Sequence, residues 1–148
     1  MGTMSEQVYH IFIKATAVQI WDAITRPELT SLYFHGSRVE TTGEAGTAIR
    51  YYAPDGSTLW GDEKVLESDP PRLLVVSWRS LFDPELAIEQ PSRVSWEIES
   101  QEGGLSKLTV THDRLEGSPK TAQSVAGGWM FILSGLKTVL ETGKPLLA

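Results

Sequence analysis

The chain has 148 residues, of which 41% are hydrophobic and 22% are charged, a composition typical of one folded domain and unlike a disordered tail, a collagen or a coiled coil. With 13 Lys and Arg against 19 Asp and Glu, the formal net charge of −6 opposes binding to a nucleic-acid backbone or an anionic membrane surface. The absence of cysteine excludes disulfides, thiolate nucleophiles and sulfur-ligated metal sites.

The chain shows no membrane or targeting segment. Its longest apolar runs, residues 73–76 and 129–133, are far shorter than the roughly 20 residues that a membrane helix needs. The first residues match neither a secretory signal nor a myristoylation pattern. We therefore expect one domain over residues 1–148, with no membrane span and a cytoplasmic location.

The N-terminal part predicts a strand followed by two short helices. Residues 8–13 are rich in β-branched and aromatic side chains, which favour a strand. Thr16 and Gln19 match a capping box, and apolar residues then recur at helical spacing. Pro27 ends that helix and opens a second short one.

The middle of the chain predicts six strands. Runs of alternating side chains are separated by turns rich in Gly and Pro, and short connections between consecutive runs favour antiparallel pairing. The runs are residues 37–41, 47–53, 58–68, 72–79, 92–100 and 106–113. The longest connection, residues 80–91, has no strand pattern, and we expect a mobile loop there.

A long amphipathic helix is predicted at the end of the chain. Ser118 as its cap and Pro119 at its first position begin the helix, and Gly143 supplies a left-handed terminator. Apolar residues recur on one face at about 100° per residue, so this face is buried. Phe131 lies off the buried face, so that either a loop covers it or it is exposed at a dimer or partner contact.

Several strings of residues resemble the motifs of one family. They are residues 18–27 (VQIWDAITRP), 54–56 (PDG), 65–73 (VLESDPPRL), 108–112 (LTVTH), 128–129 (GW) and 140–143 (LETG). Together with the order of elements, they resemble START-like (SRPBCC) proteins, in the branch of activator of heat shock protein ATPase homologues and polyketide cyclase-like proteins. The resemblance implies an α+β fold of the helix-grip, birch-pollen-allergen-like type, in which a seven-stranded curved antiparallel sheet wraps on the long C-terminal helix. It also implies a cavity between sheet and helix, which in such folds admits an apolar small molecule.

Strand alternation selects the side chains that face this cavity, because successive residues point to opposite faces of a sheet. The expected ligand-binding residues, including those of the long helix, are Tyr51, Glu63, Trp78, Trp96, His112, Trp129, Met130 and Leu133. The indole rings suit a planar or lipid-like ligand, and Met130 adds an adaptable wall. Each indole ring taken alone is better explained as part of the core, and it is the set of three that favours a ligand cavity.

Gly127 and Gly128 are adjacent within the predicted helix. Each costs about 1 kcal/mol relative to alanine, so something should offset that loss. Close approach of the helix to the two short helices, a bend that opens the cavity, and simple tolerance all account for the pair.

Glu63 departs from the family pattern, which usually has a small residue at this place. An inward carboxylate in an apolar cavity is partly desolvated, and with His112 it forms a candidate catalytic acid–base pair. Alternatively, Glu63 pairs with Arg50 or Arg79 or reaches solvent, and His112 is a hydrogen-bonded core histidine. No histidines or acids stand at metal-ligand spacing, and we expect neither a metal nor another cofactor.

Three functions are compatible with these expectations. The leading one is binding of a hydrophobic small molecule or lipid in the cavity. The second is a cyclase, aromatase or hydrolase-like enzyme that uses Glu63 and His112, although no nucleophile elbow, triad or metal motif accompanies them. The third is an interaction module for a chaperone or regulator, or a homodimer. The eukaryotic activators for which the branch is named carry an additional N-terminal domain, and we do not expect their role here.

Overall fold

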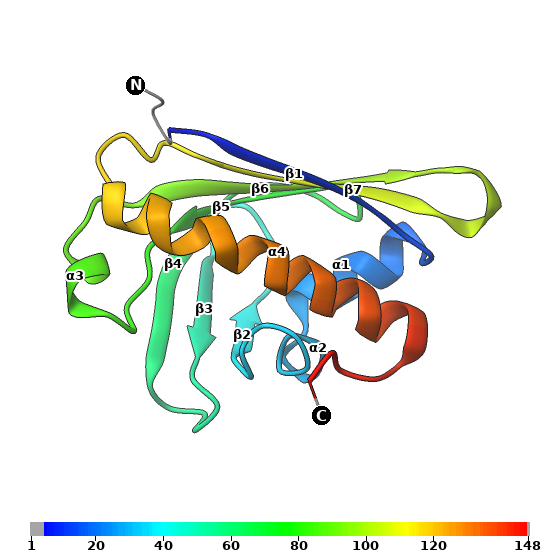
Figure 1. The fold of residues 1–148 in the computed structure, drawn as a ribbon, viewed down its shortest axis with the longest axis horizontal. Coiled ribbons are helices and arrows are strands. Elements are labelled where there is room, and N and C mark those ends of the chain that lie inside the picture. Colours follow the sequence, from blue (N-terminus) through cyan, green and yellow to red (C-terminus); the bar gives the residue numbers. More distant parts are fainter. Residues whose placement is uncertain (1–4, 148) are drawn as a thin grey trace.

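A curved antiparallel sheet and a long helix across its concave face form the fold (Figure 1). The computed structural model describes residues 5–147. The strands are β1 (Gln7–Ile13), β2 (Arg38–Thr41), β3 (Ala48–Tyr52), β4 (Leu59–Asp69), β5 (Leu73–Trp78), β6 (Ser92–Ser100) and β7 (Ser106–Asp113). They form one seven-stranded sheet in the order β1-β7-β6-β5-β4-β3-β2. The predicted α+β helix-grip architecture is therefore confirmed.

The helices follow the predicted order, with one addition. After β1 come α1 (Ala17–Thr25) and α2 (Pro27–Thr30), and α4 (Pro119–Thr142) closes the chain. The connection between β5 and β6 contains a short helix, α3 (Pro84–Ala87), and a 3₁₀ turn, η1 (Glu102–Gly104), precedes β7. The prediction missed α3 because a single helical turn leaves no periodic pattern.

The N-terminus of α1 and both ends of α4 show how the predicted helix caps are formed. Thr16 and Gln19 form both hydrogen bonds of the capping box, and Gly143 ends α4 with a left-handed φ of 78°. Ser118 is the N-cap residue and Pro119 the first residue of α4, as predicted, but the Ser118 side chain makes no capping hydrogen bond, because its Oγ donates to the carbonyl of Gln90 at 2.6 Å. The carboxylate of Glu89 replaces it by accepting the backbone N–H groups of residues 120 and 121, at 3.0 and 2.8 Å. An anion at a helix N-terminus is favourable, and it ties the β5–β6 connection to α4.

Alternation decides the inner face of the sheet as predicted. In β6, Val94, Trp96 and Ile98 are at most 2% exposed, whereas Glu97 and Glu99 point to solvent. The inner residues of β5 and β7 and the apolar face of α4 complete one hydrophobic core. Between residues 5 and 147, no helix is both long and apolar enough to cross a membrane.

At Gly135, α4 comes close to the segment that follows α2. A Cβ atom built at this position lies 3.1 Å from the Cβ atom of Tyr33, just after α2. The hydroxyl of Tyr33 donates to the carbonyl of Ala23 in α1 at 2.7 Å, which fixes its ring. The close contact suggested for Gly127 and Gly128 is therefore made two helical turns later.

Candidate functional site

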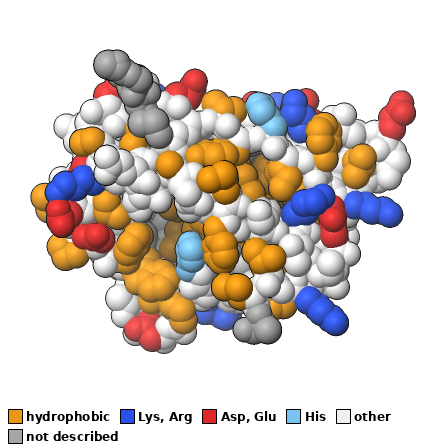
Figure 2. Space-filling model, viewed as in Figure 1, with side chains coloured by type: hydrophobic (Ala, Val, Ile, Leu, Met, Phe, Trp, Pro, Cys, Tyr) orange, Lys and Arg blue, Asp and Glu red, His pale blue; other side chains and the backbone are white. Residues whose placement is uncertain are grey.

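A pocket lies between the N-terminal half of α4 and the strands β3, β4 and β5. Its volume of about 380 Å³ lies within the range of sites that hold small ligands, roughly 300–1,000 Å³. Figure 2 shows a hollow in this region, with apolar side chains gathered around it. The aromatic side chains of its lining are Phe34, Tyr51, Trp60, Trp78, Phe82 and Trp129.

The inner aromatic rings support one another. Phe34 stacks on Tyr51 with ring centroids 5.1 Å apart and planes inclined by 28°. The ring of Trp78 lies 5.7 Å from those of both Tyr51 and Trp129. Such contacts stabilise the rings beyond their burial. These contacts therefore hold the rings of this wall in place.

The outer edge of the pocket is more open. Trp60 of β4 meets Phe82 of the β5–β6 connection edge to face, with centroids 6.4 Å apart. Phe82 is 57% exposed. On the other side, His35 lines the pocket and its ring stacks on Phe131 at 5.5 Å. The loop after α2 thus partly covers Phe131, which stays 38% exposed.

At Gly128, α4 presents backbone to the pocket. A Cβ atom built at Gly128 meets no atom within 4 Å, although this residue belongs to the lining. The neighbouring Gly127 is exposed, is absent from the lining and is equally free of contacts. The structure adds an explanation of its own for Gly128, because the missing side chain leaves open a space in the pocket; a helix bend and simple tolerance stay predictions.

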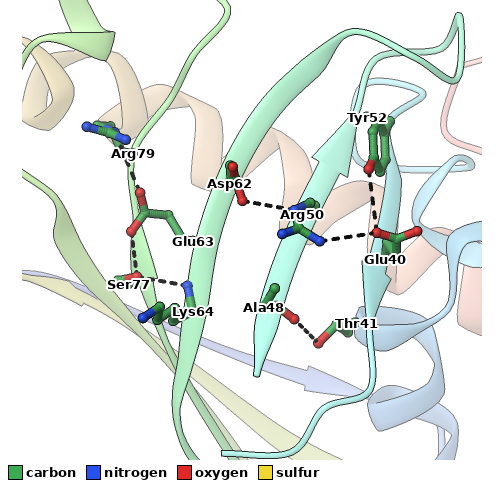
Figure 3. A network of polar contacts seen from close by, with 10 residues as sticks. All are labelled: Glu40, Thr41, Ala48, Arg50, Tyr52, Asp62, Glu63, Lys64, Ser77 and Arg79. Carbon is green, nitrogen blue, oxygen red and sulfur yellow. Dashed lines mark hydrogen bonds and ion pairs between the residues drawn. The ribbon is translucent and has the colours of Figure 1, made fainter. Parts of the chain in front are cut away.

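Glu63 carries the most buried carboxylate of the pocket, with a side chain that is 13% exposed. The hydroxyl of Ser77 donates to its Oε1 at 2.6 Å, and the Nε of Arg79 lies 3.5 Å from its Oε2. Figure 3 shows Glu63 directed at Ser77 and Arg79, while Asp62 is directed at Arg50. Of the alternatives, the ion pair with Arg79 is the one observed.

This polar cluster stands where the regular pairing of β4 with β5 ends. Their pairing extends only as far as Val65 opposite Val76. Beyond that point, the Oγ of Ser77 accepts the backbone N–H of Lys64 at 3.1 Å and replaces a bond of the ladder. Further along, the N–H of Leu81 donates to the carbonyl of Trp60 at 2.9 Å, so Glu63 lies where the regular ladder is interrupted between two hydrogen-bonded stretches.

His112 is fully buried and does not line the pocket. The indole N–H of Trp129 donates to its Nδ1 at 3.0 Å. Because an indole N–H only donates, the proton of the neutral imidazole is assigned to Nε2, which donates to the Oγ of Ser92 at 2.6 Å. That hydroxyl can then donate to the carbonyl of Trp78 at 3.3 Å. His112 therefore links two pocket residues from behind.

Burial governs the charge state of His112. It lowers the pKa of the imidazole to about 4, against the smaller opposite effect of Asp113. The ring is neutral at pH 7, and both of its nitrogens are hydrogen-bonded. The hydrogen bonds described for Glu63 and His112 do not join them, so the structure does not bring the predicted acid–base pair together.

The structure divides the residues predicted to bind a ligand. Those that line the pocket are Tyr51, Glu63, Trp78 and Trp129. Trp96 and Leu133 are 1% and 4% exposed and belong to the core instead. Met130 is 61% exposed, because the residue after Trp129 is turned about 100° around the helix and away from the sheet. The expectation that Met130 forms a wall of the cavity is corrected accordingly.

Sequence reasoning missed Trp60, Phe82 and Gly128. Phe82 lies in a connection without periodicity, and Trp60 precedes Gly61 at an irregular end of β4, where the β3–β4 register shifts. A glycine on the buried face of a helix is a signal for either a close contact or a space, but its position alone does not say which. Within residues 5–147, no group of three or more His, Asp or Glu side chains could hold a metal ion.

Comparison with known proteins finds a family that matches this chain. The pattern of the activator of Hsp90 ATPase homolog 1-like proteins matches residues 14–141. A comparison with curated proteins finds no match. Among solved structures, the Aha1 dimer from Colwellia psychrerythraea is 20% identical, with 94% of this chain and 98% of that chain covered and a TM-score of 0.73.

Two other structures show the same likeness. Protein MLL2253 from Mesorhizobium loti is 19% identical, covers 92% of this chain and 96% of that one, and has a TM-score of 0.73. DynU16, a protein of the dynemicin biosynthetic locus, is 21% identical with a TM-score of 0.76, over 95% of this chain and 49% of that one. This chain thus spans about half the length of DynU16. At these identities the likeness shows the fold alone.

Proposed function

The chain belongs to the family of activator of Hsp90 ATPase homolog 1-like proteins, and we propose that it binds a small, mainly apolar molecule in the pocket between α4 and the sheet. The observation that carries this proposal is a preformed space of about 380 Å³ with an aromatic lining. Pockets that are largely apolar and hold a few convergent polar groups are typical of small-molecule sites.

Apolar contact alone would give only weak binding at such a site. Burial of about 300 Å² of a ligand's apolar surface contributes roughly 7 kcal/mol. Association costs at least about 4 kcal/mol, which leaves a dissociation constant in the millimolar range. Tighter binding requires good shape complementarity or a specific polar contact, and Glu63, Ser77 and Arg79 are the groups available for one.

Catalysis is a second candidate function, and the position of Glu63 favours it. The carboxylate lies in the pocket wall with little exposure, where a general acid or base would be placed. His112 is bonded to Ser92 and Trp129 instead, so Glu63 would act without it. A homodimer stays a prediction, supported by the dimer in the name of the Colwellia relative. Interaction with a chaperone or regulator and a cytoplasmic location also stay predictions.

A matched pair of variants tests ligand binding. N-phenyl-1-naphthylamine is a neutral apolar dye whose fluorescence rises in apolar surroundings, and we expect saturable binding to the wild-type protein. Gly128→Phe should weaken that binding by about tenfold or more, because the new ring fills the pocket. Gly127→Phe makes the same exchange one residue earlier, on an exposed part of the helix, and should bind the dye like the wild type.

The proposal is contradicted if the wild-type protein does not bind the dye saturably, or if both variants lose binding equally. Native mass spectrometry of freshly purified protein, with delipidated protein as the control, complements the titration. A copurified small molecule that is absent from Gly128→Phe would identify the natural ligand by its mass.

A further inference from the structure

The charged groups of the pocket take part in ion pairs. Glu63 faces Arg79 across 3.5 Å, and the neighbouring Asp62 is paired with Arg50 at 3.0 Å. Arg50 also lies 3.6 Å from Glu40, so that three carboxylates face two guanidinium groups in this cluster, with a net formal charge of −1. Glu63 and Arg79 place a strong acceptor and a strong donor side by side at the pocket.

Both members of the Glu63–Arg79 pair keep unused hydrogen-bonding capacity. A carboxylate has about four acceptor positions, and only the bond from Ser77 to Oε1 is a hydrogen bond. The distance of 3.5 Å to Arg79 exceeds the usual N–H···O range, about 2.7–3.2 Å. The Nε of Arg79 is buried without a hydrogen-bond partner, and within residues 5–147 no hydrogen bond to Arg79 is described.

The Glu63–Arg79 pair discriminates between kinds of polar ligand. A carboxylate on the ligand would be repelled by Glu63, and an ammonium group would be repelled by Arg79. A hydroxyl group both donates and accepts, so that one such group can donate to Glu63 and accept from the guanidinium. Resting on the proposed function, we infer that the pocket takes a flat, neutral ring compound whose hydroxyl group lies between Glu63 and Arg79.

The body of this ligand lies among the rings. Trp78 directly follows Ser77 in β5, its ring lies 5.7 Å from that of Trp129, and Gly128 leaves open a space in the pocket beside Trp129. Walls formed by flat aromatic rings favour a flat ligand over a branched one. The hydroxyl then sets the direction in which the ring system enters the pocket.

Four probes with the same ring system test the inference. They are naphthalene, 2-naphthol, 2-naphthoate and 2-(aminomethyl)naphthalene, measured at pH 7 by displacement of N-phenyl-1-naphthylamine from the wild-type protein. We expect 2-naphthol to bind at least about tenfold more tightly than the anionic and cationic probes, because a hydrogen bond to a charged group replaces a repulsion. 2-Naphthol should also bind more tightly than naphthalene.

The variant Glu63→Gln sharpens the test. It should reduce the advantage of 2-naphthol over naphthalene, because a neutral amide oxygen accepts a weaker hydrogen bond than a carboxylate, and it should improve binding of 2-naphthoate, because the repelling charge is gone. Glu67→Gln removes the same charge from an exposed position of β4 outside the pocket, and should leave the order of the probes unchanged. Urea unfolding of both variants verifies that they fold, and the wild-type order decides the question without any variant.

Each other outcome overturns the inference in a distinguishable way. If 2-naphthoate binds most tightly, Arg79 recognises an anion and the hydroxyl assignment is wrong. If naphthalene and 2-naphthol bind equally, the apolar pocket and the proposed function stand, while the hydroxyl inference fails. If neither the probes nor the dye bind to the wild-type protein, the proposed function fails together with the inference.

Discussion

The two halves of α4 cover interiors of different kinds, and two glycines show the difference. Gly128 and Gly135 are seven residues apart, so about two turns separate them on the same face of the helix. A Cβ atom at Gly128 meets no atom within 4 Å, whereas one at Gly135 lies 3.1 Å from the Cβ of Tyr33. One glycine leaves a space open and the other permits a close contact. The comparison teaches that helical periodicity reports which face is covered, but not whether the space beneath it is filled.

The largest effect is expected from truncation in the filled half. Leu136 is fully buried in the core, so Leu136→Ala should lower the free energy of unfolding by about 2–5 kcal/mol through the cavity it creates. Ile132 lines the pocket, and Ile132→Ala should cost near the lower limit of that range, because it enlarges an existing space. Urea unfolding of both variants measures the difference. Equal losses of unfolding free energy in the two variants would contradict the proposed difference between the two halves of α4.

A larger side chain should also cost more stability in the filled half than at the pocket. Gly135→Leu forces a side chain against Tyr33 and should destabilise the protein by about 1–3 kcal/mol. Gly128→Leu extends into open space, and leucine is a better helix former than glycine, so this variant should be at least as stable as the wild type. Thermal unfolding of the pair would refute the account if Gly128→Leu proved the less stable of the two.

His112 accepts a hydrogen bond from Trp129 of α4, between the two halves of the helix. The protonation of His112 gives a pH dependence of stability. Since burial lowers its pKa from 6.5 to about 4, the unfolded chain takes up a proton below pH 6.5 that the folded protein does not. Stability should therefore fall as pH decreases from 6.5 to 5, by about 1.5 kcal/mol from this group.

The variant His112→Asn separates this contribution from that of the carboxylates. It offers an acceptor to Trp129 and a donor to Ser92 without titrating in this range. Its unfolding free energy should depend less on pH between 6.5 and 5 than that of the wild type. An unchanged pH dependence would show that His112 is not the group responsible.

The smallest effects are expected from alanine at the two adjacent glycines, where stability and ligand binding should respond differently. Gly127→Ala and Gly128→Ala should each stabilise α4 by up to about 1 kcal/mol, because both replace a glycine within a helix. Only Gly128→Ala should weaken binding of N-phenyl-1-naphthylamine, because only its methyl group enters the pocket. A loss of binding in Gly127→Ala would place the ligand elsewhere.

Much of the fold was predictable because its signals are local. Thr16 and Gln19 announce a capping box, Gly143 ends a helix, and the alternation in β6 separates inner from outer residues. The replacement of the Ser118 cap by Glu89 was not predictable, because that carboxylate comes from a connection whose path depends on tertiary structure.

The candidate site was predictable only in part. Alternation predicted that Glu63 lies on the inner face of β4. Arg79 was one of the two arginines expected to pair with it, and it is the one observed. Alternation could not show that the regular pairing of β4 with β5 ends at Val65 and Val76, next to the pocket. Nor could it distinguish Trp96, which packs beneath Trp129 with ring centroids 5.4 Å apart, from the rings that line empty space. Hollow and filled regions have the same hydrophobic pattern, and only the packing of whole side chains separates them.

The most direct test of the ligand site is a nuclear magnetic resonance titration of ¹⁵N-labelled protein with N-phenyl-1-naphthylamine. The rings of the dye should shift the backbone amide signals of Gly61 and Gly128, which line the pocket, and leave those of Gly135 and Leu136 unchanged. The account is contradicted if the largest shifts instead fall on exposed apolar residues outside the pocket, such as Ile88 and Leu147.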